Sequence, residues 1–216
     1  MIWDLIRNPT PENFLHLALV LPALVVAFTI HELCHGLAAR LLGDPTAKRD
    51  GRLSLNPVRH IDPVGFLMIL AAGFGWAKPV MVNTHNLKNP KLDMAFIAIA
   101  GPVSNFLMAF LVIFLLLALP VSGINAIVLQ AANTFIGLNI VLGIFNMLPL
   151  PPLDGSKVLA ALLPDRMYYR LPQVGPYGML ILLVLVVTGT TGLILGPAVQ
   201  AVVVVMVHAA DFIIFW

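Results

Sequence analysis

The chain has 216 residues, of which 60% are hydrophobic and 10% are charged, and its formal net charge at pH 7 is +2. A water-soluble domain carries about a quarter charged residues, so this composition excludes a soluble globular protein and indicates a lipid bilayer as the solvent. The small net charge argues against nucleic acid as a partner, and the single cysteine excludes an internal disulfide bond. Because no linker or repeat is evident, we expect one membrane domain over residues 1–216.

Four apolar stretches predict helices that cross a membrane. They cover residues 14–42, 92–119, 125–148 and 174–216, and glycine or proline bounds each of them. A helix needs about 20 apolar residues to cross the hydrocarbon core, so each stretch is long enough. The last stretch is long enough for two spans, divided at the glycine- and threonine-rich residues 188–192. The sequence therefore predicts five spans.

Residues 61–76 are a separate case, because they are apolar but short and contain three glycines. A stretch of this length is typical of a re-entrant segment rather than a span. Non-helical backbone at that depth is stable only where protein or a wet cavity satisfies its polar groups. The fold class that we expect is an all-α integral membrane protein, a polytopic bundle of five to six transmembrane helices with a re-entrant or extended segment near the active site.

Basic residues mark one face of this bundle. Of the 12 lysines and arginines, 11 lie at the end of the first span, in the segment that follows it, or in residues 149–173. The short connection 121–124 has none. Positively charged loops remain in the cytoplasm, so we expect this face to be cytoplasmic.

The first span contains the motif His31-Glu-Leu-Cys-His35. Side chains at positions i and i+4 of a helix share a face, so the two imidazoles can bind one metal ion. Glu32 can then take a proton from water bound to that metal. A charge at the centre of an apolar span costs about 2.5–3.5 kcal/mol, which favours a functional role. The plainer alternative is a pair of interfacial histidines, with Glu32 bonded to a neighbouring helix.

A catalytic zinc ion requires three protein ligands and one open position, and the first span offers only two. Asp154 is the first candidate for the third ligand, because it follows the third span on the same predicted face, and its proline-rich backbone suits a fixed ligand. An ordinary turn aspartate before Gly155 is the alternative reading. Further candidates for the ligand are His60 and Asp62, which border residues 61–76, and His208 and Asp211, which lie late in a span that we expect to return to the same face.

Two asparagines, Asn105 and Asn146, lie within predicted spans, where an unpaired amide is costly. They are candidates for positioning a substrate backbone or an oxyanion. The alternative is an interhelical hydrogen bond, worth about 0.6 kcal/mol on average. Gly101 and Pro102, near the start of the second long span, favour close packing or a local break.

Several motifs together resemble the site-2 protease family of intramembrane zinc metalloproteases, peptidase family M50, in particular its short prokaryotic members without a PDZ domain. The motifs are HELCH at 31–35, GRLSLNP at 51–57, HIDP at 60–63, GFGWAKPV at 73–80, AGPVSN at 100–105 and NMLPLPPLDG at 146–155. The resemblance implies one Zn²⁺ per chain, held by His31, His35 and Asp154, with Glu32 as the general base. It also implies a prokaryotic cell membrane, and substrates that are single-span membrane proteins cut within the bilayer.

Two other classes of function compete with a protease. A membrane metal-ion transporter would also place histidine and carboxylate side chains in its spans, and a non-catalytic membrane scaffold is the third class. Transporters usually spread their ligands along a conduit and often contain inverted repeats. This chain has one tight cluster and no repeat, which favours an enzyme.

Overall fold

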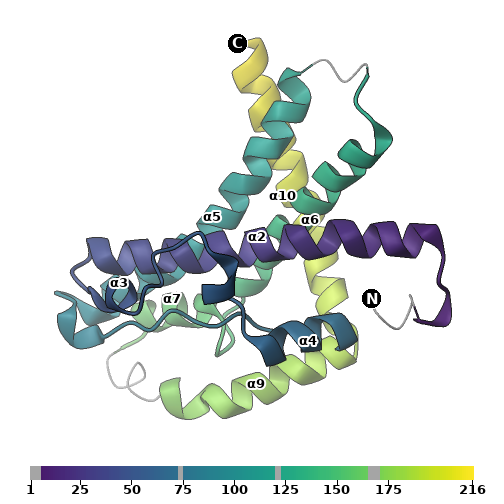
Figure 1. The fold of residues 1–216 in the computed structure, drawn as a ribbon. Helices are drawn as coiled ribbons and strands as arrows, with labels where there is room; N and C mark the ends of the chain where they lie inside the picture. Colours follow the sequence, from purple (N-terminus) through teal and green to yellow (C-terminus); the bar gives the residue numbers. More distant parts are fainter. Residues whose placement is uncertain (1–5, 73–74, 120–122, 165–170) are drawn as a thin grey trace.

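The computed structural model describes residues 6–72, 75–119, 123–164 and 171–216, and of residues 171–176 only the backbone. Gly73 of the glycine-rich motif and the basic residues Arg166 and Arg170 lie outside these ranges, as do residues 121–122 of the predicted connection. The described residues fold into helices, with one isolated β-bridge (Figure 1).

Four described helices are long and apolar enough to cross a membrane. They are α2 (Pro11–Leu41), α5 (Pro90–Ala118), α6 (Ala126–Asn146) and α10 (Thr190–Phe215). A shorter apolar helix, α9 (Leu171–Val187), precedes α10. The break between these two falls within the predicted residues 188–192, at Gly189, whose φ of 72° favours glycine. The chain is thus an integral membrane helix bundle.

Residues 61–76 form a hairpin that returns to its starting point. Helix α4 (Pro63–Ala72) has 10 residues and a length of about 15 Å at 1.5 Å per residue, too short to cross a bilayer. Ile61 pairs with Ala77 in an antiparallel bridge, and the Lys78 N–H donates to the His60 carbonyl at 2.8 Å. The two ends of this segment therefore lie side by side, at the same end of the bundle.

Helix α5 is central to the bundle, because it packs against α2, α6, α7 (Asp154–Leu162) and α10. An apolar cluster joins its second half to α6 and α10, through Ala109, Ile113, Ile136, Ile140 and Ala210. At the other end, the short elements α3 (Thr46–Arg49), η1 (Pro57–Arg59), η2 (Thr84–Asn86) and α7 gather where α2 ends and α5 begins (Figure 1). The Lys91 ammonium donates to the Leu163 carbonyl there and links α5 to the end of α7.

Asp44 fastens the loop after α2 to the segment that follows the hairpin. This fully buried carboxylate accepts hydrogen bonds from the Thr46 hydroxyl at 2.6 Å, the Asn83 N–H at 2.7 Å and the Asn86 amide at 2.7 Å. Burial alone would raise the pKa of Asp44, but these hydrogen bonds outweigh burial and lower it. Asp44 therefore holds the extended segment 77–83 in place as a charged group.

Candidate metal centre

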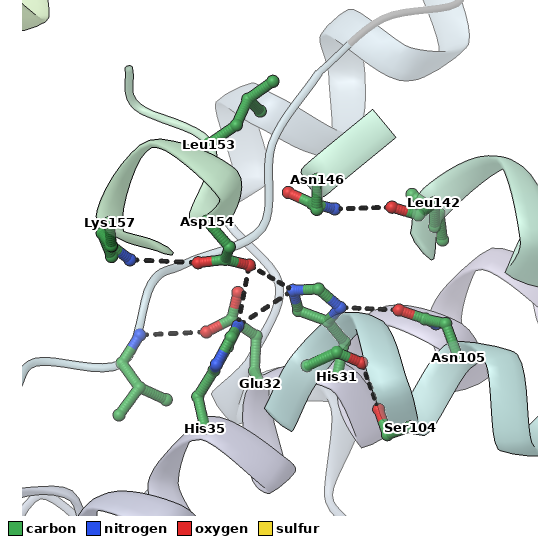
Figure 2. A network of polar contacts seen from close by, with 12 residues as sticks. His31, Glu32, His35, Ser104, Asn105, Leu142, Asn146, Leu153, Asp154 and Lys157 are labelled. Carbon is green, nitrogen blue, oxygen red and sulfur yellow. Dashed lines mark hydrogen bonds and ion pairs between the residues drawn. The ribbon is translucent and has the colours of Figure 1, made fainter. Parts of the chain in front are cut away.

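His31, His35 and Asp154 converge at the point where α2 meets the start of α7 (Figure 2). The two Nε2 atoms are 3.0 Å apart, and the Asp154 Oδ2 lies 3.2 Å from His31 Nε2 and 3.1 Å from His35 Nε2. All three side chains are buried. The i, i+4 spacing places both rings on one face of α2. Asp154 reaches them because the proline-rich turn after α6 brings the chain back toward α2.

The hydrogen-bond partner of Nδ1 in each imidazole indicates whether that nitrogen carries a proton. His35 Nδ1 lies 2.7 Å from the Ile97 carbonyl oxygen, and His31 Nδ1 lies 2.6 Å from the Asn105 Oδ1. These oxygens only accept, so each Nδ1 carries a proton, and in the neutral ring Nε2 presents the lone pair. Bonds of this kind orient histidines that bind metals.

With both rings neutral, three lone pairs face one another here, an arrangement that a cation stabilises. Ligand atoms 2.0–2.1 Å from a tetrahedral zinc ion are about 3.3 Å apart. The observed separations of 3.0–3.2 Å are close to that value. The donor set and its spacing therefore fit zinc.

Gly101 of α5 gives the two imidazoles the space that they occupy. A Cβ atom at this position would lie 2.4 Å from the His35 Nε2 and 2.7 Å from the His31 Cε1. Any side chain larger than hydrogen would therefore overlap both rings.

The Lys157 ammonium lies 3.0 Å from the other oxygen of Asp154, Oδ1 (Figure 2). The positive charge of Lys157 stabilises the ionised form of the Asp154 carboxyl group. Asp154 is therefore a carboxylate, with Oδ2 directed at the histidines and Oδ1 at the lysine.

Glu32 lies beside this group and is also buried. Its Oε2 accepts a hydrogen bond from the Val80 N–H at 3.0 Å. The Arg52 guanidinium donates to the Lys78 carbonyl and, at 3.1 Å, to the Pro79 carbonyl, and so fixes the segment that holds Glu32. A carboxylate next to a metal site, held by one peptide N–H, has the placement that a general base requires.

A cavity of about 570 Å³ opens onto these residues. Its polar lining includes Glu32, Asn146 and Lys157 together with the metal group, and the rest of the lining is mostly apolar. Of the two asparagines expected near the substrate, Asn146 lines the cavity and donates to the Leu142 carbonyl of its own helix at 3.0 Å. Asn105 is fully buried behind His31 and bonds to that ring.

The alternative third ligands have other partners. His60 Nε2 lies 2.7 Å from the Ser54 carbonyl oxygen, and the Asp62 carboxylate caps α4 by accepting from the Gly65 N–H at 2.8 Å. His208 and Asp211 were expected to return to the end of the bundle that holds the site, and this expectation is wrong. Ala210 between them belongs to the apolar cluster of the second half of α5, and the C-terminus lies beside the end of α5 (Figure 1).

Sequence reasoning missed three side chains or groups that hold the site: Asn139, Lys157 and the Val80 N–H. Asn139 carries the same signal as the other two asparagines, an amide within an apolar span. Lys157 follows Asp154 by three residues and is thus on the same face of α7. The Val80 N–H carries no sequence signal, because any residue except proline supplies it.

Comparison with known proteins agrees with this geometry. The family model for peptidase family M50 matches residues 121–188. A proposed zinc metalloprotease of Bacillus subtilis, YwhC, is 44% identical over 184 residues, which are 82% of this chain and 84% of that protein. A proposed zinc metalloprotease of Methanocaldococcus jannaschii, MJ0611, is 31% identical over 150 residues, 68% of this chain and 73% of that protein.

A third relative, the proposed zinc metalloprotease Rip2 of Mycolicibacterium smegmatis, is 28% identical over 179 residues, 79% of this chain and 67% of that protein. No solved structure matches the chain. The similarity to YwhC extends over most of both proteins. The chain therefore belongs to peptidase family M50, the family of the site-2 proteases.

Proposed function

We propose that this protein is an intramembrane zinc endopeptidase, which hydrolyses peptide bonds within the transmembrane segments of single-span membrane proteins. The observation that carries the proposal is the convergence of three buried side chains that can ligate a metal, next to Glu32, among helices apolar enough to cross a membrane. The relatives named as zinc metalloproteases support the same reading.

In this proposal His31, His35 and Asp154 hold the zinc ion, and Glu32 is the catalytic residue. Zinc bound by three protein ligands activates water and polarises a carbonyl group. Glu32 takes a proton from the attacking water and delivers it to the amine that leaves when the C–N bond breaks. The Val80 N–H keeps Glu32 in place during both transfers, since it holds the Oε2 atom.

The substrate must reach this carboxylate in an extended form, because a helix hides its own carbonyls in hydrogen bonds. Residues 75–82 are extended and contribute much of the cavity wall. An unwound substrate strand can pair with such a segment through its backbone. Asn146, which also lines the cavity, would bond a backbone amide of the substrate.

We assign the site to the cytoplasmic side of the membrane. The basic residues that follow α2 and the ion pair of Lys157 lie at the same end of the bundle as the metal group. Positively charged segments remain in the cytoplasm. Water and the substrate would then enter the cavity from that side.

Replacing Glu32 with glutamine tests the proposal. The change removes the proton acceptor and keeps the shape, so cleavage of a tagged single-span substrate in a reconstituted bilayer should fall by about 10²–10⁴-fold. Zinc content should stay at the wild-type level, because Glu32 is not a ligand. The matched control is Glu12→Gln, at the other glutamate of the chain, in the first turn of α2 far from the site.

A second variant, Asp154→Ala, distinguishes the loss of a zinc ligand from the loss of the general base. It should lose both zinc and activity, because only two ligands remain. Substantial cleavage by the Glu32→Gln protein would exclude Glu32 as the general base. Ion flux without peptide products from the wild-type protein would indicate a transporter instead.

A further inference from the structure

Asn139 is a fully buried amide in the apolar helix α6, and it touches neither the metal group nor the cavity lining. Its Nδ2 donates to the Phe135 carbonyl of its own helix at 2.9 Å, and its Oδ1 accepts from the Asn105 Nδ2 at 2.9 Å. Asn105 is the residue behind His31, so a chain of bonds leads from α6 through α5 to a ligand on α2.

The direction of every bond in this chain is determined. A backbone carbonyl only accepts, so the atom of Asn139 that faces Phe135 is its NH₂ group, and its oxygen faces Asn105. The NH₂ group of Asn105 therefore faces Asn139, and its Oδ1 faces the Nδ1 of His31 at 2.6 Å. An oxygen at this position requires the proton on Nδ1, which leaves the Nε2 lone pair directed at Asp154.

We propose that Asn139 is a positioning residue that selects the metal-binding tautomer of His31 by holding the Asn105 amide in one orientation. Without the Asn139 oxygen, the other bond of the Asn105 NH₂ group is a long one of 3.4 Å to the Ala27 carbonyl. The amide can then turn by about 180° and present its NH₂ group to Nδ1. His31 would in that case carry its proton on Nε2, the atom that binds the metal.

This inference rests on the zinc site of the proposed function, and it makes a separate prediction about the histidine itself. A merely structural Asn139 would tie α6 to α5, and its loss would lower stability without changing the protonated nitrogen of His31. The tautomer of His31 and the zinc affinity distinguish the two roles.

The test compares two substitutions at this position with a control on the same helix. Asn139→Leu removes both bonds at similar volume. Asn139→Asp keeps an acceptor for Asn105 and, as a neutral buried acid, a donor for the Phe135 carbonyl. The control is Asn133→Leu, because Asn133 is an exposed asparagine of the same helix and lies outside the cavity lining.

Two quantities are measured for each protein: zinc affinity, by competition with a chelator of known affinity, and the His31 tautomer of zinc-free protein, by ¹⁵N NMR of labelled histidine. Loss of a partner behind a metal-binding histidine typically weakens metal binding 10–100-fold. We expect a loss of zinc affinity of this size for Asn139→Leu, and we expect His31 in the zinc-free variant to carry its proton on Nε2. Asn139→Asp and Asn133→Leu should bind zinc as the wild-type protein does and keep the His31 proton on Nδ1.

Wild-type zinc affinity in folded Asn139→Leu protein, with the His31 proton still on Nδ1, would overturn the inference. If that variant does not fold, the ¹⁵N NMR measurement on zinc-free wild-type protein tests the inference. A proton on the Nε2 of His31 and not on its Nδ1 would contradict the chain of bonds from Asn139 to His31. If the wild-type protein binds no zinc, the proposed function fails, whereas the tautomer measurement still tests the role of Asn139.

Discussion

Replacing Gly101 with alanine tests whether α5 forms one wall of the metal site. The added Cβ would lie 2.4 Å from the His35 Nε2, 2.6 Å from its Cε1 and 2.7 Å from the His31 Cε1. Ordinary contacts between such atoms are about 3.5–4.0 Å, so the rings must move by about 1 Å. They cannot do so freely, since His31 is bonded to Asn105 and His35 to the Ile97 carbonyl.

The cost of the Gly101→Ala substitution can be estimated from overpacking in well-packed sites, about 1–3 kcal/mol. If the strain falls on the ligand geometry, zinc affinity should drop by about 5–150-fold, because 1.4 kcal/mol corresponds to a factor of ten. Cleavage activity at limiting zinc should fall in proportion.

The assay is chelator competition on purified wild-type protein and the Gly101→Ala variant, with Gly137→Ala as the matched control. Gly137 also lies within a membrane helix, but a Cβ there would meet no atom within 4 Å. The control should bind zinc normally and be at least as stable as the wild-type protein, because alanine favours a helix. Wild-type zinc affinity in the Gly101→Ala protein would refute the placement of α5 against the two rings.

Two further predictions concern the loops around the site. Because the pKa of Asp44 is lowered in the folded protein, its contribution to stability is complete above the ordinary carboxyl pKa of about 4 and is lost as the pH falls below that value. The difference in Tm between wild-type protein and Asp44→Asn should therefore be constant from about pH 5 to 8 and shrink below about pH 4; an undiminished difference at about pH 3 would contradict the role of the charge. Single cysteines in place of Lys48 and Lys88 should both be labelled from the cytoplasmic side, since the α4 hairpin between them returns to its starting side. Labelling from opposite sides would mean that residues 61–76 cross the membrane.

Four of the predicted membrane helices are present at the expected places, because apolar runs bounded by proline and glycine are a local signal, whereas the predicted number of five to six spans stays a prediction. The pairing of His31 with His35 was predictable for the same reason, since one helical turn sets it. The hairpin of α4 was also expected, from a length too short for a span. In each case the information lies within a few consecutive residues.

The third zinc ligand could not be predicted from local sequence. Asp154 lies 119 residues beyond His35, and the direction of its side chain depends on the turn after α6. Reasoning from the residues left five candidates for the third ligand. Only the family resemblance ranked Asp154 clearly above the other four. The expectation for Asp211 was wrong for a related reason. The position of the end of α10 depends on how that helix packs against α5, and an evenly apolar helix does not reveal it.

The hydrogen-bond partners of the asparagines could not be predicted from the sequence either. The sequence indicates that an amide in an apolar span needs a partner, but it does not indicate which one. The partner of Asn105 lies 34 residues away on α6, and the contact exists only after α5 and α6 pack together. Gly101 was expected to allow close packing, and the structure identifies the packing partners as the two metal-binding rings.

These contacts form one polar layer across three apolar helices, with His31 on α2, Asn105 on α5 and Asn139 on α6. Outside this layer the three helices contact one another mainly through apolar side chains, which lipid can replace at little cost. A shift of α6 by one turn would move Asn139 about 5.4 Å and break its bond to Asn105, which leaves the Asn139 Oδ1 without this partner in a medium without water. Each interhelical bond stabilises the native state by only about 0.6 kcal/mol, but the unpaired alternative costs several times more. The residues that orient His31 therefore also specify how α2, α5 and α6 align, so a substitution that weakens the metal site should loosen the bundle at the same depth.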